Sequence, residues 1–272
     1  MQTAPPMKEP APDMKWRKAA ASLLTPWRLN TRIAGIPPDL RPSTRSEGYR
    51  VQAALAGLTG EAGIGWKIAA TSVAGQKHIG VSGPMAGRLL ESRRKGEGAP
   101  VSIGSSAMKV GEAEFAFLMG RDLPPRERAY TVDEVLAASA ALYLAIEFPD
   151  SRYQDFVRAG EAQLIADLAC SGWMILGPRA PESWRSTDLA GHRVGAWIDG
   201  RKAADGIGSN VLGDPRIALA WVANEISREG MGLKADDIVI TGTCVAPVPV
   251  SAGQRFLADF GTLGRVSAVL TD

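Results

Sequence analysis

Residues 111–124 read GEAEFAFLMGRDLP, and residues 145–152 read AIEFPDSR. The first segment contains the apolar run FAFLM, which is rich in strand-forming side chains and ends at a glycine, so we predict a buried strand. Because side chains alternate across a strand, Glu112 and Glu114 should face the same side. Glu147 follows a second apolar run, in the second segment. The two segments therefore place three carboxylates beside chain that is expected to be buried.

Carboxylates in such positions need an explanation. Like charges on one strand face repel each other, and an ionised glutamate with apolar neighbours is rarely buried without a partner. A hard divalent cation with oxygen ligands would account for all three placements. The alternative is that Glu112 and Glu114 lie on the solvated face of an edge strand and that Glu147 caps a surface turn.

The two segments, together with IADLACSGWMILGP at residues 165–178, resemble the fumarylacetoacetate hydrolase superfamily. Within it, the chain is most similar to the branch of 2-keto-4-pentenoate hydratases and 4-oxalocrotonate decarboxylases, from about Arg41 to the C-terminus. In that branch, Mg²⁺ or Mn²⁺ is held by the two glutamates of an E-x-E motif and by the glutamate before a D-S-R turn. The resemblance thus implies Glu112, Glu114 and Glu147 as metal ligands.

The resemblance also suggests residues that contact the substrate. The branch carries a G-[WY]-K motif whose lysine faces the metal site, which implies Lys67 as a catalytic group; from composition alone, Lys67 would be a surface lysine of an edge strand. Thr241 and Gly242 match the branch and would place a hydroxyl or a backbone N–H at the substrate. Arg152 either binds substrate or forms a structural bridge with Asp150, and we favour the bridge.

One departure concerns substrate identity. Members of the branch usually show D-N-A-S where this chain has D-L-A-C, so Leu168 replaces an asparagine. Cys170 and Cys244 do not form a disulfide framework, are expected to be buried structural thiols, and fit a reducing cytoplasm. We assign no role to His78.

Composition excludes several function classes. The net charge of +2, from 31 Lys+Arg and 29 Asp+Glu, gives no global field that would favour nucleic acid or a membrane surface. No apolar stretch reaches membrane-spanning length. The longest, residues 135–146, is about a dozen residues long and is predicted to be a core helix that follows a capping box at Thr131.

Three regions are expected along the chain. Residues 1–13 are predicted to be a disordered tail, residues 14–62 a small helical region, and residues 63–272 the catalytic β-roll domain. In the helical region, Pro26 should interrupt the first helix, and a capping box at Thr44 should open the second. Strands outnumber helices after Gly63 without regular alternation, which favours an α+β fold. The resemblance implies a mixed β-sandwich roll with flanking helices and a homo-oligomer.

The implied function is that of a lyase of aromatic-compound catabolism. The chain would be a metal-dependent hydratase that adds water to a 2-hydroxy-2,4-dienoate and yields a 4-hydroxy-2-oxo acid. A 2-oxo-3-enedioate decarboxylase using the same site is the main alternative. Less favoured are an acylpyruvate hydrolase, for which we find no additional aspartate ligand or histidine base, and a non-catalytic scaffold.

Overall fold

The computed structural model describes residues 14–272, so the predicted tail over residues 1–13 lies outside the described part of the chain. The helices are α1 (Met14–Leu29), α2 (Arg45–Thr59), α3 (Val73–Ile79), α4 (Val132–Ala138), α5 (Glu161–Ala166) and α6 (Pro215–Arg228). The strands are β1 (Gly63–Ala69), β2 (Met85–Leu90), β3 (Arg94–Gly96), β4 (Pro100–Ser102), β5 (Val110–Met119), β6 (Ser139–Phe148), β7 (Trp173–Arg179), β8 (Arg193–Ile198), β9 (Arg201–Ile207), β10 (Ile238–Thr243), β11 (Val248–Pro249), β12 (Arg255–Asp259) and β13 (Arg265–Thr271). Two short 3₁₀ turns also contribute to the site, η2 (Phe156–Arg158) and η3 (Leu168–Cys170).

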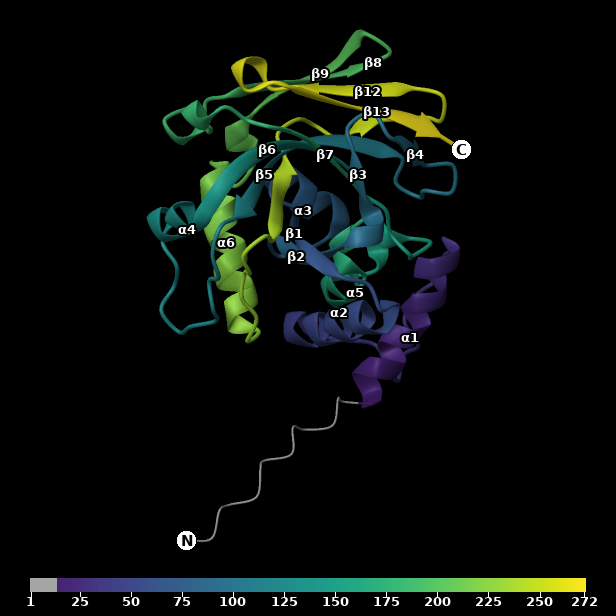
Figure 1. Ribbon diagram of the computed structural model, residues 1–272. Coiled ribbons are helices and arrows are strands. Elements are labelled where there is room, and N and C mark those ends of the chain that lie inside the picture. Colours follow the sequence, from purple (N-terminus) through teal and green to yellow (C-terminus); the bar gives the residue numbers. More distant parts are fainter. Residues whose placement is uncertain (1–13) are drawn as a thin grey trace, which may run out of the picture.

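The strands form two mixed sheets, one stacked above the other (Figure 1). The larger sheet has eight strands in the order β2-β1-β10-β5-β6-β7-β3, with β11 paired to β5. The smaller sheet has five strands in the order β4-β13-β12-β8-β9. Helices flank the larger sheet, with α6 packed against β10, β1 and β2. The predicted α+β architecture is therefore confirmed.

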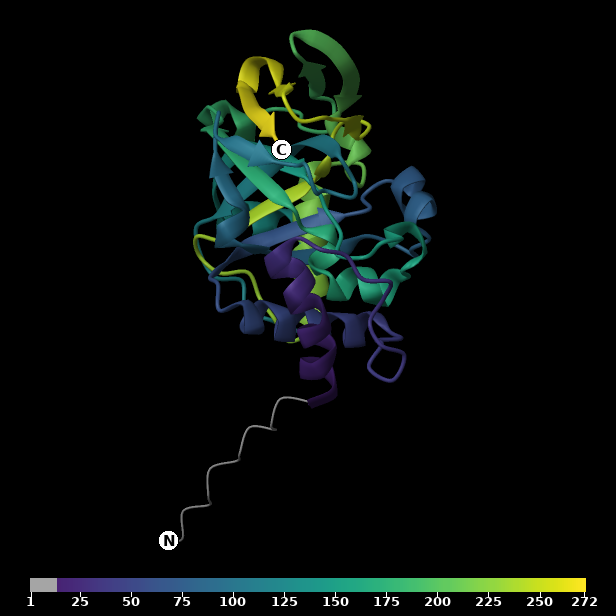
Figure 2. The same cartoon turned by 90° about the vertical axis from the view of Figure 1, so that its right-hand side faces the viewer.

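The N-terminal helices pack onto the rest of the fold. Helix α1 crosses α2 (Figure 2), and α2 contacts α5 and β2. The capping box at Thr44 opens α2 as predicted. The predicted interruption at Pro26 is wrong, because α1 continues to Leu29 with Pro26 and Trp27 buried, and this burial offsets the lost backbone hydrogen bond. Side chains of α1 and α2 share one apolar core with both sheets, so the division into two units at residue 63 remains a prediction.

The predicted helix over residues 135–146 is wrong beyond its first turn. Its capping box at Thr131 is present, but α4 ends at Ala138 and the chain continues directly into the ten-residue strand β6. Strand β6 lies between β5 and β7 and pairs with both, and its aromatic and β-branched side chains suit that position. Pairing on both edges outweighs the helix preference of its alanines. Consequently Glu147 lies within a central strand of the sheet.

One face of the larger sheet combines an apolar patch with the acidic residues. Ala116 on β5, Ala145 on β6 and Ile240 on β10 belong to a small buried cluster. Glu112, Glu114 and Glu147 lie further along the same face, because they are separated from these residues by even numbers of positions. The opposite face of β5 carries Phe115 and Phe117, which pack into the main core. In the described chain, no helix is long and apolar enough to cross a membrane.

Candidate active site

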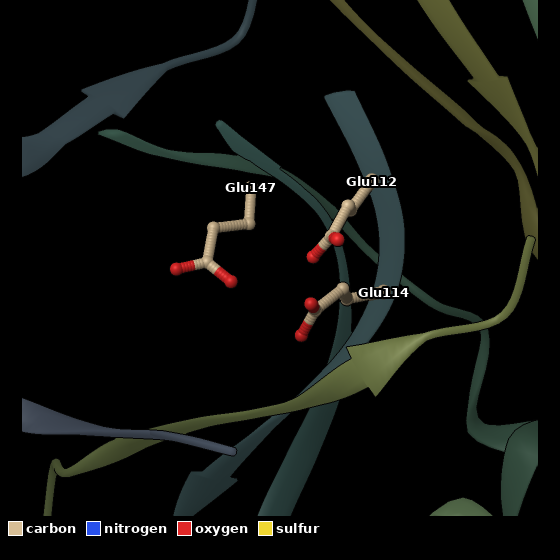
Figure 3. A group of neighbouring side chains, drawn as sticks. All are labelled: Glu112, Glu114 and Glu147. Atoms are coloured by element: carbon tan, nitrogen blue, oxygen red, sulfur yellow. The ribbon is translucent and has the colours of Figure 1, made fainter. Parts of the chain in front are cut away.

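Two neighbouring strands bring the three glutamates together. Glu112 and Glu114 share a face of β5, and Glu147 lies directly opposite Glu112 in the antiparallel register of β5 and β6. The three side chains point into a common space (Figure 3). One carboxylate oxygen from each residue lies within 4.8 Å of those of the other two. The alternative of a solvated edge strand is thereby contradicted, because β5 lies between β10 and β6.

These carboxylates have few partners within the protein. Glu114 is 0% exposed and Glu147 is 1% exposed. The backbone N–H of Gly242 donates to Oε2 of Glu114 over 2.7 Å, but Oε1 of Glu114 and Oε1 of Glu147 accept no hydrogen bond from residues 14–272. Buried carboxylate oxygens without donors are costly. Three converging hard oxygen donors fit a divalent cation.

The local electrostatics agree with this geometry. Burial and the charge of Glu147 raise the pKa of Glu112 to about 7. Burial and the neighbouring carboxylates raise the pKa of Glu114 well above its ordinary value. Burial also raises the pKa of Glu147, although the ammonium group of Lys67 opposes the shift. The protein alone therefore disfavours three ionised carboxylates here, and a bound cation would reverse this preference.

Lys67 is the cationic member of the site. It lies on β1, which is paired with both β2 and β10, so the composition-based view of an edge-strand lysine is wrong. Lys67 is 2% exposed as a residue, and its Nζ lies 3.0 Å from Oε2 of Glu147 and donates to the carbonyl of Ala169 over 3.2 Å. Burial lowers the pKa of Lys67, but the charges of Glu147 and its two neighbours outweigh burial and raise it overall.

The absence of a side chain at Gly65 allows β1 to pair closely with β10. Its φ is +139°, and a Cβ on this residue would lie 1.9 Å from the carbonyl oxygen of Ile238 on β10. Only glycine combines this backbone angle with such close contact. The parallel pairing of β1 with β10, which carries Lys67 toward the carboxylates, depends on it.

The lysine and the acidic group open into a cavity of about 670 Å³. Lys67, Glu112 and Cys170 line it at the site, together with residues of α3, of η2 and of the segment after β10. Its further walls are formed mainly by apolar side chains, which include Ile68, Ala70, Ala74, Ile79, Met108, Val110, Pro149, Phe156, Val245, Ala246 and Pro247. Most of these residues could not be predicted from the sequence, because they come from segments that are far apart in the chain.

Thr241 and Gly242 make hydrogen bonds to β5, the strand that carries Glu112 and Glu114. The hydroxyl of Thr241 is buried and donates to the carbonyl of Phe115, and Thr241 is not among the described residues that line the cavity. Gly242 has a φ of +104°, and a Cβ there would lie 2.4 Å from the hydroxyl of Thr71, so glycine lets the chain turn its N–H toward Glu114. A substrate contact by either residue remains a prediction.

Arg152 is not among the described residues that line the cavity. The guanidinium is 3% exposed, pairs with Asp167 and donates to the carbonyls of Ser171 and Asp167. The favoured bridge to Asp150 is wrong in its partner, because Asp150 pairs with Arg32 instead. The structural role that we favoured for Arg152 agrees with these contacts.

The turn η3 is a feature that the sequence did not reveal. Leu168, Ala169 and Cys170 have φ values of 53°, 49° and 59°, so three successive non-glycine residues are left-handed. Each costs on the order of 1–2 kcal/mol. The turn directs the Ala169 carbonyl at Lys67, and the preceding Asp167 is held by Arg152. Leu168, where the chain departs from D-N-A-S, lies in this turn, but the sequence did not predict the turn or its geometry.

The cysteines are buried thiols, as expected. Burial raises the pKa of the Cys170 thiol to about 12, and burial likewise raises the pKa of Cys244. Cys170 nevertheless lines the cavity beside Lys67. As a neutral thiol it contributes shape and a weak donor to the wall.

Comparisons with known proteins agree with this description. Residues 89–271 match the family model described as fumarylacetoacetate (FAA) hydrolase C-terminal. A 2-keto-4-pentenoate hydratase from Burkholderia vietnamiensis is 36% identical over 214 residues, which cover 78% of this chain and 80% of that protein. A 2-hydroxyhexa-2,4-dienoate hydratase from Comamonas testosteroni is 32% identical over 79% of this chain and 80% of its own length. Among solved structures, a 4-oxalocrotonate decarboxylase from Pseudomonas putida G7, complexed with magnesium and adipate, superposes with a TM-score of 0.85 at 25% identity, covering 97% of this chain and 100% of that chain.

Proposed function

The chain belongs to the fumarylacetoacetate hydrolase family, and from that premise we propose that it is a divalent-metal-dependent hydratase of a 2-hydroxy-2,4-dienoate. The product is a 4-hydroxy-2-oxo acid, and the enzyme is a hydro-lyase of aromatic-compound catabolism. Several relatives bear the names of such hydratases. The observation that carries the proposal is the convergence of Lys67, the buried Glu114 and Glu147, and the half-buried Glu112 beside a largely apolar cavity.

Glu112, Glu114 and Glu147 would hold the cation. Their converging oxygens support this assignment, as do the Oε1 atoms of Glu114 and Glu147, which accept no hydrogen bond within the described part of the chain. When bound, Mg²⁺ or Mn²⁺ supplies a Lewis acid for the carboxylate and the 2-oxygen of the substrate. Three carboxylates and one ammonium group carry a charge of −2, so a divalent ion makes the buried site neutral.

Lys67 would act on the reacting part of the substrate. Its ammonium group is held by Glu147 and by the Ala169 carbonyl, and it also lines the cavity. Because both contacts are made by buried groups, the ammonium is oriented before substrate arrives. From there it can stabilise negative charge on the 2-oxygen or hold a proton for transfer.

The reaction has two stages, which are ketonisation of the dienol and addition of water. The 2-hydroxyl group loses its proton and C5 gains one, which converts the dienol into a 2-oxo-3-enoate. Water then adds its oxygen to C4 and a proton to C3. Both stages place negative charge on the 2-oxygen, so a group fixed beside that atom, as Lys67 would be, assists both.

Decarboxylation of a 2-oxo-3-enedioate is the second candidate, and the structural likeness to the 4-oxalocrotonate decarboxylase favours it. Such a substrate has a second carboxylate at its far end, which would need a cationic or donor-rich partner. Of the described residues that line the cavity, Lys67 and His78 are the ones that can carry a positive charge. The largely apolar wall supports hydration of a monocarboxylate.

The test supplies purified protein and Mg²⁺ with 2-hydroxypenta-2,4-dienoate and, separately, with 2-oxohex-3-enedioate. Hydration predicts loss of the dienoate absorbance and formation of the 4-hydroxy-2-oxo acid without carbon dioxide. Carbon dioxide from the diacid, with the dienoate untouched, would replace the proposal with decarboxylation. A Glu114→Gln variant serves as the control for any background reaction.

Two further assignments complete the proposal. Free, buried cysteines support a reducing cytoplasmic setting. A homo-oligomer is proposed from the family resemblance. Sedimentation of the purified protein measures its oligomeric state.

A further inference from the structure

We propose that the natural substrate carries a bulky apolar group beyond C5 of the dienoate, and that the cavity wall formed by α3, η2 and Met108 binds this group. The inference rests on the proposed hydratase function and goes beyond it by naming the class of substrate. Three observations carry it, namely the size of the cavity, the chemistry of its wall and the exposure of the helix beside it.

The cavity is large for the simplest substrate of this kind. Its volume of about 670 Å³ lies within the range of about 300–1,000 Å³ that is usual for sites of drug-sized ligands. A five-carbon 2-hydroxydienoate has about eight non-hydrogen atoms, far fewer than a drug-sized ligand that fills such a site. Its carboxylate and 2-oxygen would be held beside Glu112 and Lys67, and so small a molecule leaves most of the cavity unfilled.

The wall of the remaining space is suited to hydrocarbon. Ile79, Met108 and Phe156 are half-buried apolar side chains that pack against the main core and also line the cavity. Val245 and Pro247 line it as well. Apart from Lys67 and Glu112 at the metal end, the ionisable side chains among the described lining residues are His78 and the neutral thiol of Cys170. An apolar group therefore gains more here than a second carboxylate would.

Helix α3 borders the cavity and is itself largely exposed. None of its residues is buried, although Ala74, Gly75, His78 and Ile79 line the cavity. Apart from the half-buried Ile79, this helix has little apolar contact to hold it, although helical stability in proteins comes mainly from packing of an apolar face. An apolar substituent lying between α3 and η2 would supply that contact. The same cavity is continuous with Glu112 and Lys67, which identifies the occupant as the tail of the substrate.

The expected gain follows from burial of hydrocarbon. Each methylene moved from water into an apolar site contributes about fourfold to affinity, and incomplete burial reduces this to about twofold. A propyl or phenyl group at C5 should thus raise kcat/KM by about 10-fold or more over the unsubstituted dienoate.

The test compares 2-hydroxy-2,4-dienoates that carry hydrogen, methyl, n-propyl or phenyl at C5, with the full chain and Mg²⁺. We expect kcat/KM to rise along the series. Ala74→Phe should fill the space beside α3 and reduce the ratio of kcat/KM between the phenyl and unsubstituted compounds at least fivefold. Val73→Phe is the matched control, because Val73 neighbours Ala74 but is 80% exposed and is not among the described lining residues. This variant should leave both the ratio and the rate on the short substrate unchanged.

A binding measurement separates this inference from the function on which it rests. In calorimetry with Mg²⁺, 2-oxo-5-phenylpentanoate should bind at least 10-fold more tightly than 2-oxopentanoate, whether or not the protein hydrates dienoates. Equal affinities, together with equal rates along the dienoate series, would overturn the tail-binding wall and leave the hydratase intact. Preference for the phenyl compound in binding, with no dienoate turned over, would instead reject the hydratase and retain the wall. A diacid bound more tightly than either 2-oxo acid would also overturn the inference.

Discussion

Replacing Lys67 with methionine is the sharpest test of the site. The substitution Lys67→Met keeps the unbranched apolar stem and removes the ammonium group. In the native protein that group is almost fully buried, lies 3.0 Å from the Glu147 carboxylate and donates to the Ala169 carbonyl. The variant therefore loses one positive charge at the cavity wall and two polar contacts.

The size of the effect follows from these contacts. A fixed donor aimed at developing negative charge typically contributes about 10²–10³ in kcat. We expect kcat to fall about 10²-fold or more, which corresponds to about 2.7 kcal/mol or more in the activation barrier. Metal binding should be retained, because all three carboxylates remain and one positive charge that repels the ion is removed.

The assay is steady-state turnover of the dienoate, combined with calorimetric titration of Mg²⁺ or Mn²⁺. Lys77→Met is the control, since Lys77 is an exposed lysine on α3 that is not among the described lining residues. Thermal unfolding in the presence of metal verifies that both variants fold. Turnover of Lys67→Met equal to that of the control would refute the catalytic role of Lys67.

Three further predictions concern the metal, the pH and the buried ion pair. Saturation with Mg²⁺ at about 100 times Kd should add about 2.7 kcal/mol to the free energy of unfolding, and Glu114→Gln should abolish this gain in a denaturant titration; an equal gain in the variant would exclude Glu114 as a ligand. In the metal-free protein, the pKa of Glu112 is about 7 against an ordinary 4.5, so the folded state holds a proton that the unfolded chain releases. The free energy of unfolding should therefore fall as pH rises from about 4.5 to about 7, by up to about 1.4 kcal/mol per pH unit for this group. Saturating metal should remove this decline. A difference in unfolding free energy between metal-free and metal-bound protein that stays constant with pH would contradict the prediction. Arg152→Met should cost about 3–5 kcal/mol in unfolding free energy, because it leaves the buried carboxylate of Asp167 without its cation. Arg128→Met breaks an exposed pair and should cost less than about 1 kcal/mol. Similar losses in both variants would refute that distinction.

The sequence by itself determined which residues could carry chemistry and much of the local structure. Alternation along the strand placed Glu112 and Glu114 on one face, and the structure has them so. Capping residues such as Thr44 marked where helices begin. These features depend on neighbours within a few positions, so they can be read from a single chain.

Only the tertiary structure decided how these residues meet. Local preference favoured a helix across residues 139–146, but pairing with β5 and β7 makes this segment a strand and sets Glu147 opposite Glu112. Lys67 reaches Glu147 from β1, three strands away in the order of the sheet, through the close approach that Gly65 permits. Lys67 and Glu147 lie 80 positions apart in the sequence. The free energy of such a contact arises from burial and strand pairing, which local propensities do not encode.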